Sequence, residues 1–362
     1  MKNKKILLVI ILVITAVLSL FIIQDKFNKE ELSVNNTTQT VEITKSQPKE
    51  LNSTIQRILE DGVDMYNAKG GVAIVMNANT SQVIVDISVS NKNEIINYST
   101  NFLYEPGAIM NAFTVAMGLE NKVISDSSVL DVSTPLKLGN ATIKDYRGEN
   151  RELSLSESLI HSSNIGAAQI GLKVGAENQK LFLNDINLFN QVSADALKPQ
   201  APKKWEEENI AVLSYGYGFL TTPLNIISAY SSLVNGGKYN TVTQNNEIIS
   251  KRVLSEENSK LMQKYLRDVV LLGSGNPANI DNVEVMGKTG TSNKIKDGKY
   301  VEKDVVSTFV GNFEHNGINY AILVLIDEPQ PLEETFGFAT AGWNAVPIAK
   351  VIIDNIIKNN QS

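Results

Sequence analysis

Cysteine is absent from this chain and histidine is rare, with only His161 and His315 present. A chain without cysteine forms no disulfide and offers no thiolate ligand to zinc. The two histidines lie far apart, and neither has a serine and an acid at the spacing of a histidine-based triad, so we expect them to be helix-end or loop residues. We therefore expect no metal site and no cofactor.

Positive charge is also scarce. The chain has 33 Lys and Arg against 39 Asp and Glu, for a net charge of -6, and its pI is near 5.2. Because no dense cluster of Lys and Arg is available to bind a phosphate backbone, we expect no nucleic-acid partner. Hydrophobic residues make up 43% of the chain and charged residues 20%, which is an ordinary globular composition.

Residues 6–23 form an apolar run without a charged side chain. As a helix the run extends about 27 Å at about 1.5 Å per residue, which is close to the thickness of a bilayer's hydrocarbon core. Three lysines precede it, whereas Asp25 and Lys26 cancel after it, so the N-terminus is predicted to stay in the cytoplasm and the rest to be exported. Residues 19–23 contain no small-x-small cleavage site, which favours a retained single-pass anchor over a cleaved signal peptide.

The rest of the chain divides by composition. Residues 27–50 are polar and irregular, which predicts a solvated tether between an anchor segment (1–26) and a folded domain (51–362). Helical periodicity dominates from about 105 to 270, and we expect this stretch to form a helical subdomain inserted in the domain.

Two helices have clear boundaries. Ser154 and Glu157 have the spacing of a capping box, so a helix is predicted to begin there and to end near His161. A 3.6-residue period of apolar side chains from 343 to 357 predicts a helix that closes the chain.

Strand patterns lie on both sides of the helical stretch. Their ranges are 71–76 and 82–87, which predict an antiparallel hairpin, and then 283–290, 305–313 and 319–326. We therefore expect an α/β (α+β) fold with one mixed, mainly antiparallel sheet assembled from both ends of the domain. Helices are expected to flank the sheet, and a cleft is expected where the helical subdomain meets it.

Three short elements carry a family resemblance. In chain order they are Glu105-Pro106-Gly107, Ser162-Ser163-Asn164 and Lys288-Thr289-Gly290-Thr291. Each is a weak signal alone, but further similarity covers nearly all of 51–358. The chain resembles the penicillin-recognising serine transpeptidases, and among them the transpeptidase domain of class B penicillin-binding proteins, which serve division or elongation. The resemblance implies a serine β-lactamase/transpeptidase-like fold.

The resemblance also implies a chemistry, which is acyl transfer on the D-Ala-D-Ala end of a cell-wall stem peptide. In the family, the serine of an S-x-x-K element attacks the carbonyl and its lysine takes the proton. The S-x-N serine passes a proton to the leaving amine, the K-T-G lysine and the threonine after it hold the carboxylate, and backbone N–H groups, here of Ala108 and Thr291, form the oxyanion hole. The implied ligand-binding residues are Ser162, Asn164, Lys288, Thr289, Gly290 and Thr291.

The S-x-x-K element itself is degenerate, because Ala108 and Asn111 occupy its two functional positions. Alanine has no heteroatom to acylate, and an amide is not a useful proton acceptor near neutral pH. The only Ser-x-x-Lys sequence, at 46–49, lies in the predicted tether, where Pro48 disfavours a helical turn. From these residues we expect no catalytic residue and no enzyme, that is, a pseudo-D,D-transpeptidase.

Three functions are consistent with these features. The one favoured by the sequence is a catalytically inactive scaffold, regulator or non-covalent stem-peptide binder that works with cell-wall synthesis proteins. The second is an active D,D-transpeptidase or carboxypeptidase with an unrecognised nucleophile, and the third is a decoy or sensor that binds a β-lactam reversibly. In each case we expect attachment to the inner membrane through residues 6–23, with the bulk of the chain in the periplasm.

Overall fold

The computed structural model of the chain describes residues 49–91, 96–139, 141–242 and 247–359. The predicted anchor at 6–23 and nearly all of the predicted tether lie outside these ranges. Within the described ranges, none of the helices combines the length and the apolar character that a membrane crossing requires. The division of the chain into anchor, tether and domain therefore stays a prediction.

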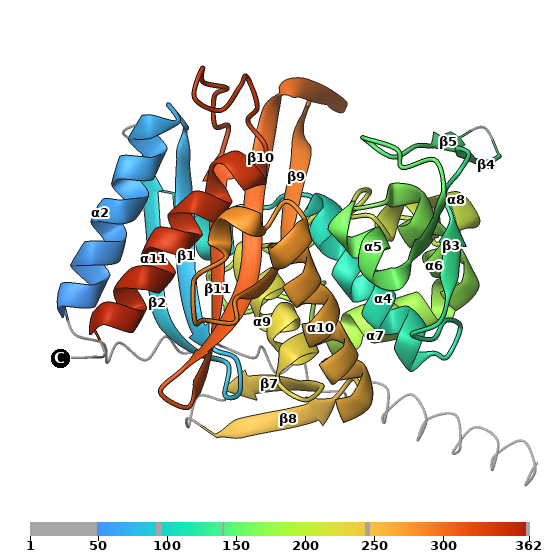
Figure 1. The fold of residues 1–362 in the computed structure, drawn as a ribbon, viewed down its shortest axis with the longest axis horizontal. Coiled ribbons are helices and arrows are strands. Elements are labelled where there is room, and N and C mark those ends of the chain that lie inside the picture. Colours follow the sequence, from blue (N-terminus) through green and yellow to red (C-terminus); the bar gives the residue numbers. More distant parts are fainter. Residues whose placement is uncertain (1–48, 92–95, 140, 243–246, 360–362) are drawn as a thin grey trace, which may run out of the picture. The chain divides into compact units, whose positions relative to one another are not determined.

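A five-stranded sheet lies at the centre of the described region (Figure 1). Its strands are β1 (Gly70–Asn77), β2 (Gln82–Ser90), β9 (Met286–Lys296), β10 (Lys299–His315) and β11 (Ile318–Asp327). Their order in the sheet is β2-β1-β11-β10-β9, and each of these pairings is antiparallel. Strand β1 from the start of the domain thus pairs with β11 from its end, with Gly70 opposite Asp327.

The two faces of the sheet belong to two apolar cores. Successive side chains of a strand point to opposite faces, and accordingly Ala73 packs in one core while Ile74 packs in the other. Strands that are apolar at nearly every position, such as β1 and β11, fit a sheet that is covered on both faces. Helices α2 (Lys49–Met65) and α11 (Ala345–Asn359) contact each other and cover one face (Figure 1).

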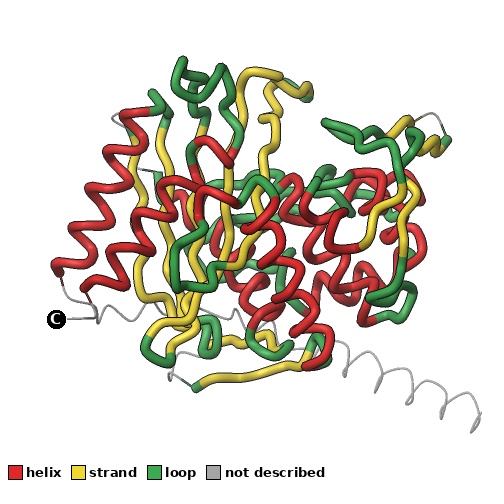
Figure 2. Tube along the Cα trace, in the orientation of Figure 1, coloured by secondary structure: helices red, strands yellow, loops and turns green. Residues whose placement is uncertain are grey.

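Helices from the middle of the chain pack in the other core, and Figure 2 shows the helix-rich part of the molecule to which they belong. They are α3 (Tyr98–Asn101), α4 (Met110–Glu120), α5 (Leu155–Ile160), α6 (Asn164–Val174), α7 (Ala176–Asp185), α8 (Glu207–Leu213), α9 (Pro223–Val234) and α10 (Glu256–Leu272). Helix α4 is buried from Met110 to Leu119 and contacts α5, α6, α9 and α10. A helix that is apolar on all sides is stable only inside a core, so α4 is the central support of this half.

Short elements connect the larger ones. The 3-10 helices are η1 (Gly107–Ile109), η2 (Asn276–Ala278) and η3 (Ala341–Trp343), and the short strand pairs are β3 (Val129–Asp131) with β6 (Glu152–Ser154), β4 (Leu136–Leu138) with β5 (Ala141–Ile143), and β7 (Lys238–Val242) with β8 (Ile248–Arg252). These strand pairs were not predicted, because strands of three to five residues are too short to show a period.

The predicted fold class is confirmed, and the sheet is antiparallel at every pairing among the described strands. The predicted hairpin corresponds to β1 and β2. The predicted capping box is present at the start of α5, where Ser154 and Glu157 bond each other's backbone N–H groups. Strands β9 and β10 are longer than predicted, because a two-residue turn at Asp297 (φ 51°) and Gly298 (φ 75°) joins them directly.

Candidate active site at the edge of strand β9

The Lys-Thr-Gly-Thr segment lies in β9, which is an edge strand of the central sheet. One side of β9 pairs with β10, where Lys288 stands opposite Val310 and Gly290 stands opposite Thr308. Its other side contacts η1. The edge of the sheet therefore meets the start of α4 at this point.

Two glycines allow the backbone of the Pro-Gly turn to reach β9. A Cβ atom on Gly290 would lie 2.4 Å from the carbonyl oxygen of Pro106, and one on Gly107 would lie 2.8 Å from that of Thr291. Gly107 also has a φ of 57°, which glycine adopts at little cost. The sequence Glu-Pro-Gly thus places Ala108 directly beside the Lys-Thr-Gly-Thr segment.

Ser162 lies in the turn between α5 and α6. Helix α5 ends in a Schellman motif, in which the Ser163 N–H donates to Ser158 O at 2.9 Å and the Ser162 N–H donates to Leu159 O at 3.3 Å. Ser162 has the left-handed conformation that this motif requires, with a φ of 53°. Ser163 then caps α6, since its hydroxyl accepts from the N–H of Gly166 at 2.9 Å. Two helix ends therefore fix the backbone of Ser162.

A neighbouring segment braces the same turn. The Asp145 carboxylate accepts from the Ser163 hydroxyl at 2.8 Å and from the Ile165 N–H at 2.9 Å. The amide of Asn164 donates to the Lys144 carbonyl oxygen at 3.1 Å. Sequence reasoning missed Asp145, because no local pattern marks a residue whose partners lie about twenty positions further along the chain. Asn164, which we predicted to bind ligand, uses its amide nitrogen within the turn.

The side chain of Lys288 extends from β9 to this turn. Its Nζ atom donates to Ser162 Oγ at 2.6 Å and to Thr289 O at 3.1 Å. The side chain is fully buried, and among the described residues no carboxylate forms an ion pair with it. Burial lowers the pKa of Lys288 to about 7, because an ammonium group is poorly solvated there. Near neutral pH the group is therefore present both as ammonium and as free amine.

The two threonines of the segment are oriented by other elements. The hydroxyls of Thr289 and Ser274, which follows α10, lie 2.5 Å apart. The hydroxyl of Thr291 accepts from the N–H of Ala341 in η3 at 3.1 Å. These contacts hold both hydroxyls at the edge of β9, and Thr291 remains half-buried rather than covered. Sequence reasoning missed Ser274 and Ala341 because neither lies in a motif.

The start of α4 has a different character. Ala108 in η1 contributes only a methyl group, and Asn111 is 1% exposed. The Asn111 amide nitrogen donates to the Ser163 carbonyl oxygen at 3.5 Å, while its Oδ1 atom has no hydrogen-bond partner among the described residues. A buried acceptor without a partner costs about 1–3 kcal/mol. Asn111 thus lies directly under the Ser162 turn and supports it weakly.

A buried carboxyl fastens the hairpin of β9 and β10 to this region. Glu105 Oε1 accepts from the Gly218 N–H at 2.6 Å and from the Tyr300 hydroxyl at 3.2 Å. Burial raises the pKa of the Glu105 carboxyl, and these two hydrogen bonds partly offset the rise. Because Tyr300 lies in β10 next to the turn, its bond ties the turn end of the hairpin to the residue that precedes the Pro-Gly turn.

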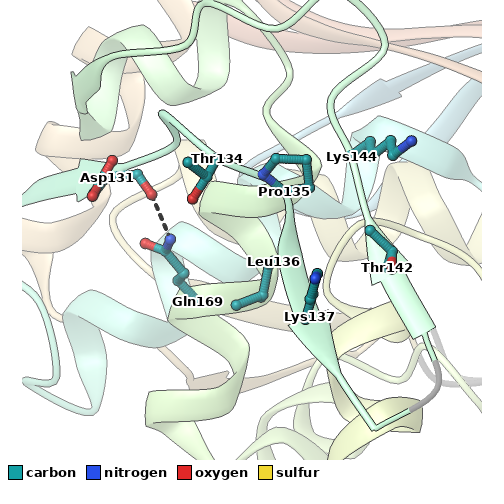
Figure 3. A pocket seen from close by; sticks show the side chains of 8 residues that line it. All are labelled: Asp131, Thr134, Pro135, Leu136, Lys137, Thr142, Lys144 and Gln169. Carbon is teal, nitrogen blue, oxygen red and sulfur yellow. Dashed lines mark hydrogen bonds between the residues drawn. The ribbon is translucent and has the colours of Figure 1, made fainter.

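A pocket of about 710 Å³ opens in the helical half, and no residue of β9 lines it (Figure 3). Its lining residues are Asp131, Thr134, Pro135, Leu136, Lys137, Thr142, Lys144 and Gln169. Two of these residues bond each other, since the Gln169 amide donates to the Asp131 backbone oxygen at 2.6 Å. None of the predicted site residues lines this pocket. We assign the site to the edge of β9, because the lysine and hydroxyl groups of the predicted site gather there.

This arrangement brings the Lys-Thr-Gly-Thr strand, the Ser-Ser-Asn turn and the Pro-Gly turn together in space. A sequence model of the penicillin binding protein transpeptidase domain matches residues 71–354, which include all three elements. The chain belongs to the penicillin-binding protein transpeptidase family. The recognition of this family from the three motifs is confirmed.

Several named relatives in this family are similar along most of the chain. The probable peptidoglycan D,D-transpeptidase FtsI of Caulobacter vibrioides is 32% identical over 333 residues, which cover 83% of this chain and 56% of the relative. Stage V sporulation protein D of Bacillus subtilis is 26% identical and covers 86% and 52%. Peptidoglycan D,D-transpeptidase FtsI of Escherichia coli K12 is 25% identical and covers 92% and 59%. The chain thus spans between about half and three fifths of the length of these relatives.

Solved structures of the transpeptidase family show the same fold. The apo transpeptidase domain of Burkholderia pseudomallei penicillin-binding protein 3 has a TM-score of 0.77 at 24% identity and covers 86% of this chain and 95% of its own. Penicillin-binding protein 3 of Mycobacterium tuberculosis, solved with aztreonam, has a TM-score of 0.76 at 19% identity, with coverage of 87% and 78%. At these identities the likeness concerns the fold alone.

The relatives correct one prediction. We expected from Ala108 and Asn111 that this transpeptidase-family chain is not an enzyme, and relatives named as peptidoglycan D,D-transpeptidases contradict that expectation. The prediction treated the start of α4 as the only source of a reactive hydroxyl. In the structure, the hydroxyl of Ser162 lies beside Lys288 in the same region. The site therefore still contains a hydroxyl next to a lysine, although the start of α4 supplies neither.

Proposed function

We propose that this protein acts in peptidoglycan D,D-transpeptidation and binds the D-Ala-D-Ala end of a stem peptide along the edge of β9. The reaction class is acyl transfer at the peptide carbonyl. The names of the relatives support the reaction. The observation that carries the assignment to this edge is the buried ammonium group of Lys288, which pairs with no carboxylate in the part of the chain that the structure describes.

An unpaired buried cation is unfavourable, since it has left water without gaining a counter-ion. The peptide's terminal carboxylate supplies that counter-ion, and a charge-assisted hydrogen bond is about twice as strong as a neutral one. The pKa of Lys288, lowered to about 7 by burial, rises when the carboxylate binds. Carboxylate binding and proton binding at Lys288 therefore favour each other.

The neighbouring groups suit the rest of the same ligand. Thr289 and Thr291 supply hydroxyls that other segments already orient, which lowers the entropy lost on binding. Gly290 keeps a side chain off the strand edge. Ser162 and Asn164 belong to the turn opposite this edge, and we propose that both contact the bound peptide together with these residues of β9.

We further propose that the protein works at the outer face of the inner membrane with other cell-wall synthesis proteins, attached through residues 6–23. The uncharged run at that position supports the attachment. The relatives' names, which concern peptidoglycan, support the setting.

Calorimetry on the detergent-solubilised full chain tests the binding proposal. One peptide ends in D-Ala-D-Ala with a free carboxylate and its partner ends in the corresponding amide. We expect the amide to bind at least tenfold more weakly, because it gives Lys288 no counter-ion. The same loss is expected for the acid peptide on Lys288→Met.

The matched control is Lys264→Met, which removes a lysine from the exposed face of α10. It is expected to bind the acid peptide as the natural protein does. Equal affinity for acid and amide, or no binding of either peptide, would refute the proposal.

A further inference from the structure

We propose that the pocket between α6 and the two-stranded ribbon of β4 and β5 (the β4–β5 ribbon) binds an acidic peptide segment in extended form. The segment carries carboxylates on alternate residues. The pocket measures about 710 Å³, which is within the range of ligand sites in proteins. None of the residues of the site at the edge of β9 lines it, so the proposal concerns a second surface and goes beyond the proposed function.

The register of the β4–β5 ribbon places two lysines on one of its faces. Lys137 of β4 stands directly opposite Thr142 of β5. Lys144 follows Thr142 by two positions, and side chains two positions apart in an extended chain point to the same face. The two lysines are therefore diagonal neighbours across the ribbon, and such neighbours lie about 7–8 Å apart. Figure 3 shows both lysines on the same side of the pocket as Thr142.

The two ammonium groups lack a counter-ion within the described part of the chain, where neither Lys137 nor Lys144 forms an ion pair. The acidic residue that lines the pocket is Asp131, but its carboxylate accepts from the N–H of Ser133 at 2.9 Å and from its hydroxyl at 2.5 Å. Glu208 of α8 lies near the turn of the ribbon and pairs with neither lysine. Like charges on one face repel each other, and an anion placed between them removes that repulsion.

The backbone that carries these charges is already fixed. The carbonyl oxygen of Lys144 accepts from the Asn164 amide at 3.1 Å. On the opposite wall, the Gln169 amide of α6 donates to the Asp131 backbone oxygen at 2.6 Å. The other face of the ribbon is anchored by Ile143, which is buried in the helical core. Binding therefore orders only the ends of side chains, which limits the entropy lost.

The rest of the lining suits a peptide better than a bare inorganic anion. Pro135 and Leu136 contribute apolar surface. The hydroxyls of Thr134 and Thr142 have no hydrogen-bond partner among the described residues and can bond the main chain of a peptide. In an extended peptide, alternate side chains point the same way and lie about 6.6 Å apart. Two carboxylates at that spacing match the diagonal of the two lysines and meet one ammonium group each.

Fluorescence anisotropy on the detergent-solubilised full chain tests the proposal with short labelled peptides. The probe contains Glu-Val-Glu, carries the fluorophore on its N-terminus and ends in an amide, so that it has no terminal carboxylate for the site at β9. One comparison peptide contains Gln-Val-Gln. The other contains Glu-Glu-Val, whose two carboxylates point to opposite faces. We expect the probe to bind about tenfold or more tightly than either, because only the probe forms both charge-assisted hydrogen bonds.

The double variant Lys137→Gln with Lys144→Gln should bind the probe about tenfold or more weakly, since it keeps the pocket and removes both charges. Lys180→Gln is the matched control, because Lys180 is an exposed lysine of α7 that forms no ion pair among the described residues. It is expected to bind the probe as the natural protein does. All three lysines are exposed, so these substitutions disturb no packed side chain.

Several outcomes would overturn the proposal. Equal affinity for the Glu-Val-Glu and Gln-Val-Gln peptides, or an equal loss in Lys180→Gln and in the double variant, would show that the two lysines are not the site. Equal affinity for Glu-Val-Glu and Glu-Glu-Val would contradict the register. Displacement of the probe by inorganic phosphate as effectively as by unlabelled peptide would show a site for any anion.

The calorimetry with the D-Ala-D-Ala peptide separates this proposal from the proposed function. Binding of the probe without binding of the D-Ala-D-Ala peptide would refute the proposed function alone. Binding of the D-Ala-D-Ala peptide without binding of the probe would refute the acidic-peptide site alone.

Discussion

The edge of β9 and the start of α4 lie against each other, yet their side chains differ in kind. On the edge of β9, the buried ammonium of Lys288 meets the hydroxyl of Ser162 at 2.6 Å. At the start of α4, Ala108 has only a methyl group, and the buried amide oxygen of Asn111 has no hydrogen-bond partner among the described residues. Among the described residues of these two regions, a lysine and hydroxyl groups are therefore found together only at the edge of β9.

The difference teaches that backbone placement and side-chain chemistry are separable in this fold. The Pro-Gly turn approaches β9 through Gly107 and Gly290, whose contacts involve main-chain atoms and do not depend on the residue at 108. The start of α4 therefore keeps its place beside the Lys-Thr-Gly-Thr segment although its reactive side chains are gone.

The largest expected effect comes from giving the start of α4 the chemistry that it lacks. In the double variant Ala108→Ser with Asn111→Lys, we expect acylation by fluorescent penicillin to become at least 100-fold faster, because a hydroxyl and a base now face the same edge. Peptide mapping should place the adduct at position 108. Asn111→Lys alone serves as control and should not gain rate. A folded double variant with an unchanged rate would show that α4 does not face the site.

A smaller effect is expected from forcing the two regions apart. Gly290→Ala places a Cβ atom 2.4 Å from the Pro106 oxygen, and such overpacking typically costs about 1–3 kcal/mol. We expect the free energy of unfolding in urea to fall by about 2–3 kcal/mol and peptide binding to weaken. Gly148→Ala is the control, since its Cβ would meet only the flexible Asn150 side chain, at 3.1 Å. Equal losses in both variants would contradict the close approach.

The smallest effect concerns the amide under the Ser162 turn. Asn111→Leu removes a buried oxygen that bonds none of the residues that the structure describes, so we expect the free energy of unfolding to rise by about 1 kcal/mol.

Asn225 is the matched comparison for that prediction. It is equally buried, but its amide donates to Asn187 O at 2.7 Å and Asn190 O at 2.9 Å and accepts from the Thr222 hydroxyl. Asn225→Leu leaves these partners without a hydrogen bond and should lower the free energy of unfolding by about 2–3 kcal/mol. The same sign for both variants in chemical denaturation would contradict the bonding described for Asn111.

Much of the fold was predictable from local patterns. The hairpin of β1 and β2, the capping box at Ser154 and the helix α11 follow from short-range signals that the tertiary structure keeps. The short strand pairs were missed because three to five residues show no period. The long β9–β10 hairpin was missed because its turn at Asp297 and Gly298 lies in a polar stretch that breaks the apolar pattern.

The site was predictable only where motifs carry it. Ser162 and Lys288 are separated by 126 positions. The family resemblance predicted that they lie in one site, whereas the periodicity of the sequence gives no information on contacts at that separation. Asp145, Ser274 and Ala341 were missed because their contacts are long-range and partly through backbone N–H groups, which any residue supplies. The expectation of no enzyme weighed only Ala108 and Asn111, and it is contradicted by relatives named as peptidoglycan D,D-transpeptidases.

The most direct test of the central claim is the proton linkage of peptide binding, measured by calorimetry near pH 7.5 in two buffers of different ionisation enthalpy. If the peptide carboxylate pairs with Lys288, binding raises the pKa of that group from about 7, so the complex takes up a fraction of a proton and affinity falls from pH 6 to pH 8. The uptake should vanish in Lys288→Met. Binding without proton uptake, at an affinity independent of pH, would contradict the account.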